Sequence, residues 1–229
     1  MKYNSSLSLR CATFLLLLIT IPQRVSSQQS IQFGIHANPL FGWFNSNNSN
    51  VTGKGIHTGF NFGVTLNKYF HENYAFSTGL SLITAGGSIA NSEAITLDLN
   101  KPIEVLPGNR VTYKVKYLAI PVGIRLKSNE IGYFTIFTDL GFDPKITLGG
   151  KAEIPSQHIY KENANHLLKS ISMGYHIIGG IEYSLGGTTS VVLGLNLDNN
   201  FTDIIKEKGN QPSAKITHKM LGIHLGLNF

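Results

Sequence analysis

The chain has little charge, almost no cysteine and, beyond its first residues, no long apolar run. Charged residues make up 14% of the 229 positions and form no basic cluster interleaved with aromatics, which argues against a nucleic-acid surface. Cys11 is the one cysteine, so the chain has no internal disulfide and no cysteine-ligated metal site. After residue 27 no run approaches the roughly 20 apolar residues that a membrane-spanning helix needs. Any membrane insertion by that part of the chain must therefore use strands.

The first residues have the pattern of a secretory signal peptide. Lys2 and Arg10 precede the apolar run 11–21, which is followed by small residues. The run is too short for an uncleaved anchor helix. We therefore predict that residues 1–27 are a cleaved signal peptide.

The clearest strand pattern is a hairpin over residues 117–142. In its first half the apolar residues share one parity: Leu118, Ile120, Val122, Ile124 and Leu126. In its second half the same alternation continues through Phe134, Ile136, Leu140 and Phe142. The polar turn 127–130 is short enough only for an antiparallel pair. Each strand has about 10 residues, the length of a tilted strand that crosses a bilayer. Pro121 predicts a local break in the hydrogen-bond ladder.

The same alternation recurs along the chain and gives eight strands in total. The six further strands are expected at 31–44, 60–67, 76–82, 171–183, 191–198 and 221–229. Their connections alternate between short, at 68–73, 127–130 and 184–187, and long, at 45–57, 86–111, 143–169 and 203–215. Short periplasmic turns, long extracellular loops and an even strand number are typical of outer-membrane barrels. We predict an all-β fold, an eight-stranded antiparallel up-and-down transmembrane β-barrel over residues 28–229, with both termini in the periplasm.

The second face of each strand decides which way the apolar residues point. A soluble lipocalin-like barrel also alternates, with its apolar residues inside. Here the other face is rich in glycine, with scattered Asn, Ser and His and few Lys or Glu, which suits a narrow polar lumen better than a water-facing exterior. The apolar face is therefore predicted to contact lipid. Aromatic residues near strand ends, Phe44 and Tyr69 among them, are expected to form interface girdles.

The hairpin YLAIPVGIRLKSNEIGYFTIFTDLGFDPKI at 117–146 resembles the PorT-like outer-membrane β-barrel family of Bacteroidetes. Further similarity lies in NYAFSTGLSL at 73–82 and in GGIEYSLGGTTSVVLGLNLDNNFTDI at 179–204. The resemblance covers essentially the whole chain after residue 27. It implies the barrel fold and the outer membrane, and some members of the family act in protein secretion.

Several ionisable residues share the predicted inward parity. They are His36, Arg125, Asp139, His176, Glu182, Asp198 and His224. Arg125 and Glu182 lie near short turns and are expected to meet across the lumen. We favour a structural ion pair that fills the narrow barrel over a proton relay or a solute constriction.

The two histidines His36 and His224 lie on the first and last strands, which become neighbours when the barrel closes. A hydrogen-bonded structural pair is favoured there over a metal site, because no cysteine or clustered acid completes a ligand set. A Ser-His-Asp arrangement that uses Ser77 or Ser81 is not specific. We therefore predict no catalytic, cofactor or metal-binding residues and no enzyme activity.

The expected function is that of an integral outer-membrane barrel with a structural or binding role. One form of that role is a component of a secretion or surface complex, and the alternative is a narrow porin or small-solute transporter. The expected partners are outer-membrane lipid, the barrel-assembly machinery through the C-terminal strand ending at Phe229, and an envelope protein at the long loops, above all 143–169. No nucleic acid is expected.

Overall fold

The computed structural model describes residues 31–99, 101–206 and 214–229, and the predicted signal peptide at 1–27 lies outside them. No helix in the described ranges is long and apolar enough to cross a membrane. The elements are β1 (Ile31–Ser46), β2 (Val51–His71), β3 (Tyr74–Asn91), β4 (Ile95–Asp98), β5 (Pro102–Val105), β6 (Arg110–Ala119), β7 (Val122–Lys127), β8 (Phe134–Ile154), β9 (Ile159–Asn163), β10 (Ile171–Gly186), β11 (Thr189–Asn200), β12 (Ile216–Asn228) and the short 3-10 helices η1 (Pro155–Gln157) and η2 (Asn165–Leu167).

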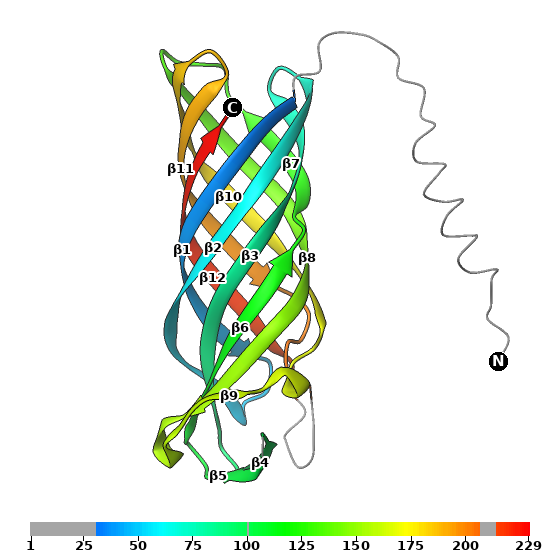
Figure 1. The fold of residues 1–229 in the computed structure, drawn as a ribbon, viewed down its shortest axis with the longest axis vertical. Helices are drawn as coiled ribbons and strands as arrows, with labels where there is room; N and C mark the ends of the chain where they lie inside the picture. The colour runs from blue at the N-terminus through cyan, green and yellow to red at the C-terminus, as the bar shows by residue number, and fades with distance from the viewer. Residues whose placement is uncertain (1–30, 100, 207–213) are drawn as a thin grey trace, which may run out of the picture.

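The main sheet closes on itself into an antiparallel barrel (Figure 1). Neighbouring strands pair in chain order, and β1 pairs with β12 to complete the ring. Strands β6 and β7 together form one of the eight walls of the barrel, since both pair with β3 on one side and β8 on the other. The predicted all-β, eight-stranded, up-and-down barrel is therefore confirmed.

Pro121 separates β6 from β7, as the sequence predicts. Pairing with β3 stops after Ser81↔Ala119 and resumes at Thr78↔Val122 in the same register. The prolyl nitrogen has no hydrogen to donate, and Thr78 Oγ1 donates to the Pro121 carbonyl at 3.0 Å. The break thus removes ladder bonds without shifting any side chain to the opposite face.

The short connections and both described chain ends lie at one end of the barrel, which we call the turn end (Figure 1). The connections there are 72–73, 128–133 and 187–188. Phe33 and Phe229 exchange backbone hydrogen bonds of 3.0 and 2.8 Å, which fixes the last strand beside the first. The opposite end, the loop end, carries β4, β5 and β9. That the turn end faces the periplasm stays a prediction.

The loop end is more ordered than the sequence suggests. The predicted loop at 45–57 is only a turn at 47–50, because β2 already begins at Val51. Strand β8 runs to Ile154, so the first part of the predicted loop 143–169 is barrel wall. Within the predicted long loop 86–111, β4 and β5 pair as a separate hairpin. The added residues of β2 and β8 make the barrel wall longer than the alternation of residues predicted, whereas β4 and β5 form a separate two-stranded sheet.

A broad belt of exposed apolar side chains surrounds the turn-end part of the barrel, and the predicted outward face of the hairpin contributes to it. The belt residues include Phe60, Phe62, Val64, Leu80, Leu82, Ile120, Val122, Ile124, Ile136, Leu140, Phe142, Ile146, Ile177, Ile181, Leu193, Leu195, Leu221, Ile223 and Leu225. Two of the expected girdle aromatics do not join it. Phe44 is buried in the core of the loop end, and Tyr69 points into the lumen, where its hydroxyl donates to Gln32 Oε1 at 3.1 Å.

Toward the loop end the polarity of the two faces reverses. On β6 the inward residues become apolar, with Val115 and Tyr117 buried, while Lys114 and Lys116 point outward and are exposed. A bulge in the β6–β8 pairing lies at the same level and shifts the inward parity of β8. The inward residues of the loop end pack into an apolar core that includes Leu40, Phe44, Ile89, Leu97, Val105, Val111, Tyr113, Ile154, Leu167, Leu168, Ile204, Ile205 and Met220.

Candidate functional site in the barrel lumen

The seven ionisable residues with inward parity all lie inside the barrel. None of His36, Arg125, Asp139, His176, Glu182, Asp198 and His224 is more than 8% exposed. All except Glu182 line one cavity in the lumen, but hydrogen bonds and ion pairs do not join them in one network. The structure divides them between an ionic cluster at the turn end, a second ionic cluster deeper in the lumen, and a histidine pair beside the second cluster.

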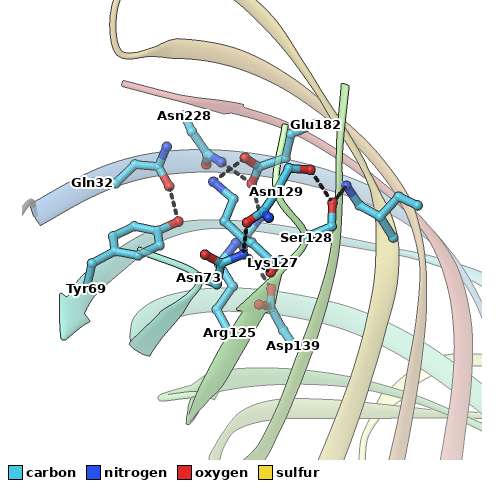
Figure 2. Close-up of polar contacts among 11 residues, drawn as sticks. Gln32, Tyr69, Asn73, Arg125, Lys127, Ser128, Asn129, Asp139, Glu182 and Asn228 are labelled. Carbon is cyan, nitrogen blue, oxygen red and sulfur yellow. Dashed lines mark hydrogen bonds and ion pairs between the residues drawn. The ribbon is translucent and has the colours of Figure 1, made fainter. Parts of the chain in front are cut away.

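The turn-end cluster joins Arg125 to carboxylates from two other strands (Figure 2). Arg125 Nη1 donates to Asp139 Oδ2 at 2.9 Å, and Nη2 donates to Glu182 Oε1. Lys127 Nζ lies 2.5 Å from Glu182 Oε2, and Asn228 Nδ2 donates to Glu182 Oε1 at 3.0 Å. Each buried charge therefore has an opposite charge within reach, which is the condition under which a buried ion pair is tolerated.

Strand register explains why these side chains meet. Arg125 on β7 is directly opposite Asp139 on β8, so both side chains leave the same face of the sheet. Glu182 lies on β10 and approaches from the next wall of the barrel. The aromatic ring of Phe137 lies beneath the Arg125 guanidinium, with 4.1 Å between Cζ and the ring centroid. The predicted contact of Arg125 with Glu182 is present, although the functional meaning of the cluster stays a prediction.

The second cluster lies deeper and includes residues that the sequence prediction missed. Lys145 Nζ is 2.5 Å from Asp198 Oδ1 and donates to Asn200 Oδ1 at 2.7 Å. His176 Nδ1 is 2.8 Å from Asp143 Oδ1. Lys145 is fully buried, so it is held by these partners alone and has no access to bulk water.

Asp143 and Lys145 could have been found from the sequence. They continue the inward parity of Phe137, Asp139 and Gly141 without interruption. The predicted strand ended at Phe142, and the predicted loop began at residue 143. In the structure Pro144 lies within β8, where its carbonyl accepts the Ile120 amide at 3.0 Å opposite the break at Pro121.

The histidine pair is close but makes no direct hydrogen bond. The ring centroids of His36 and His224 are 5.4 Å apart, and His36 Nε2 is 3.2 Å from Ser81 Oγ. These groups border a polar cavity of about 50 Å³ in the middle of the lumen. That volume holds roughly three water molecules. It leaves no space for a substrate beside Ser81, and within the described residues no group of His, Cys, Asp or Glu could hold a metal ion.

The turn-end cluster opens on a wider polar mouth. This recess has a volume of about 390 Å³ and is lined by Gln32, Tyr69, Lys127, Glu130 and Glu182 among others. It ends at the Arg125 cluster. Solute that enters the mouth therefore meets ion-paired side chains that fill the barrel cross-section, as expected for an interior only wide enough for side chains.

The model of the outer membrane protein β-barrel domain family matches residues 23–206, which is well over half of the chain. The chain belongs to this family. Its members are outer membrane barrels, which agrees with the belt of exposed apolar side chains around this one. No curated protein matches the sequence.

Solved structures of outer membrane proteins have a similar fold. Neisserial surface protein A is 10% identical over 86% of this chain and 95% of its own, with a TM-score of 0.47. The attachment invasion locus protein Ail of Yersinia pestis is 10% identical over 89% and 100%, with a TM-score of 0.42. The outer membrane protease OmpT of Escherichia coli is 8% identical over 90% and 99%, with a TM-score of 0.45. At these identities the likeness describes the fold alone.

The first prediction concerns the two cations that share Glu182. Arg125→Ala leaves two buried carboxylates short of a partner and should lower the free energy of unfolding by about 3–5 kcal/mol. Lys127→Ala should cost about 1 kcal/mol or less, because its side chain lies at the open mouth, 14% exposed, and solvent screens the loss. Urea unfolding in lipid vesicles, followed through the fluorescence of Trp43, measures both. Equal losses for the two variants would contradict this reading of the cluster.

Proposed function

We propose that this outer membrane barrel is a non-conducting binding barrel whose folded loop end contacts another envelope protein. The observation that carries the proposal is the double closure of the lumen. Paired charges fill the turn-end half, and an apolar core fills the loop-end half. Because the lumen of such a barrel is filled, we expect the barrel to act through its exposed surface.

The loop-end closure is built from segments that fold back into the barrel. Leu97 of the β4–β5 hairpin is 1% exposed, and Leu167 of η2 is equally buried. Ile204 and Ile205, from the connection before β12, join the same core. The connections at this end therefore pack as a cap with its own apolar interior, and this packing fills the pore.

The cap presents a surface that is fixed in shape. Gln157 Nε2 donates to the Glu104 carbonyl at 2.5 Å, which ties η1 to β5, and His166 Nε2 contacts the Asp98 carbonyl. Leu106 and Tyr160 are large apolar side chains that remain exposed there, at 58% and 60%. A preorganised surface with exposed aromatic and aliphatic anchors suits protein recognition.

Placement in the membrane completes the proposal. The start of β1 and the end of β12 both lie at the turn end. If the turn end faces the periplasm, the cap lies outside the cell. The aromatic residue Phe229 at the end of β12 fits recognition by the barrel-assembly machinery. The resemblance to PorT-like barrels favours a partner from a secretion or surface complex. The proposed role is not enzymatic.

The closed lumen predicts the outcome of a conductance measurement. The purified barrel should pass no steady current in planar lipid bilayers, because both halves of the lumen are filled. Lys145→Ala should also pass none, since the apolar core at the loop end remains in place. A shift in gel mobility on heating checks that both proteins are folded. Stepwise single-channel currents from the wild-type barrel would instead support the alternative, a narrow porin or small-solute transporter.

The cap predicts where a partner can be cross-linked. Cross-linking in native outer membrane, followed by affinity purification, should recover a defined envelope protein with the wild-type chain. Replacing Leu106 and Tyr160 by Ser should abolish its recovery. The matched control replaces Ile131 and Tyr133, which are exposed at 67% and 66% at the turn end, and should leave recovery unchanged. Equal recovery with both double variants would contradict binding through the cap.

The segment for such experiments is narrower than the sequence suggested. Residues 143–154 belong to β8 and pair with β6 and β10, so deleting 143–169 would remove part of the barrel wall. The excursion proper begins at Pro155, after β8 ends. Surface substitutions therefore test the cap without destroying the fold that carries it.

A further inference from the structure

A basic groove runs along the outer wall of the barrel just beneath β9 and η2. It has a volume of about 470 Å³ and is lined by residues of β3, β6, β8 and β9 together with Asn165. Four of its lining residues are lysines, and none is acidic: Lys114, Lys116, Lys151 and Lys161. All four are exposed. The groove is separate from the lumen and from the exposed apolar residues of the cap.

The positive charge of the groove is only partly neutralised. Lys114 Nζ pairs with Glu153 Oε1 at 3.0 Å. Lys116, Lys151 and Lys161 form no ion pair with any described residue. Their ammonium groups are therefore free to bind an anion.

The floor and the roof of the groove are fixed by hydrogen bonds. On the floor, Gly149 leaves the wall without a bulky side chain beneath Asn165. Asn165 Oδ1 accepts the Gly150 amide at 2.5 Å, and the Ala164 amide donates to the Gly150 carbonyl at 3.0 Å. Lys151 of β8 is paired directly with Asn163 of β9. The overhanging segment is thus attached to the wall and holds Lys161 near the lysines of β6 and β8.

The groove lies at the boundary of the apolar belt. Leu148 is one of its lining residues and is 54% exposed, and Ile146, two positions earlier on the same strand, is 45% exposed. On β6 the outward residue after Lys116 is Leu118, followed by exposed Ile120. On both β6 and β8, the outward-facing side chains therefore change from charged to apolar within a few residues. In a membrane this is the level at which acyl chains end and headgroups begin.

We infer that this groove binds a phosphate-bearing lipid headgroup of net negative charge in the leaflet at the loop end. The lysines supply charge for the phosphate, and Thr84, Asn163 and Asn165 supply hydroxyl and amide groups for hydrogen bonds. Leu148 and the belt below it receive the acyl chains. A soluble anion would gain only the charged contacts, whereas a lipid gains both. The inference depends on the membrane position of the barrel and not on the proposed partner of the cap.

The test measures binding of fluorescent phosphatidic acid to the full barrel in micelles of a neutral detergent. The variant replaces Lys116, Lys151 and Lys161 by Gln, and Lys114 is kept for its pair with Glu153. The control replaces Lys54, Lys101 and Lys215 by Gln, which removes the same charge outside the groove. Heat-dependent gel mobility checks that both variants fold.

We expect the groove variant to bind phosphatidic acid at least tenfold more weakly than wild type, and the control variant to bind it within about twofold. Phosphatidylcholine should bind weakly to all three proteins, and inorganic phosphate at the same concentration should not displace the bound lipid. Equal binding by the two variants would overturn the inference. Full displacement by inorganic phosphate would also overturn it, because the site would then select a free anion.

Discussion

The structure depends on a reversal of polarity along the barrel wall, which is clearest on the wall made by β6 and β7. Around the turn-end part the outside is apolar and the inside polar, and toward the loop end this order is reversed. The wall made by β6 and β7 contains both states, since outward Lys116 gives way to Ile120 while inward Tyr117 gives way to Arg125. An exterior in lipid requires apolar side chains, and an exterior in water allows a conventional apolar core. We infer that the level of the reversal lies at the membrane boundary.

The closure of the lumen follows from that reversal. An eight-stranded interior is only wide enough for side chains, so whatever fills it also blocks it. In the lipid-facing half the filling is polar, and charges such as Arg125 and Lys145 persist there because carboxylates lie beside them. In the loop-end half the filling is apolar and the connections contribute to it. We therefore propose two outer surfaces as the sites of specificity, the cap with Leu106 and Tyr160 and the lysine groove.

The sequence predicted the features that follow from the alternation of residues along one strand, and it missed those that depend on contacts between distant segments. Strand number, the inward position of Arg125 and the break at Pro121 all follow from alternation and from the chemistry of proline. The extension of the wall toward the cap was missed for two reasons. On β6 the alternation keeps its phase but the outward residues change from apolar to lysine, and on β8 the bulge shifts the inward parity. Lys145 was missed because the predicted strand ended at Phe142, whereas β8 continues to Ile154. The contact of Arg125 with Glu182 was expected from their shared inward parity near short turns, whereas the pairing of Lys127 with Glu182 joins two walls of the barrel and has no local signal.

The reversal of polarity on β6 can be measured directly by cysteine labelling. Lys114, Lys116, Leu118 and Ile120 are changed one at a time to Cys in a chain whose Cys11 is changed to Ser, and each barrel is placed in lipid nanodiscs. A water-soluble maleimide should react at positions 114 and 116 at least ten times faster than at positions 118 and 120, because the first two lie in water and the last two in lipid. Similar rates at all four positions, or faster reaction at 118 and 120, would contradict the account.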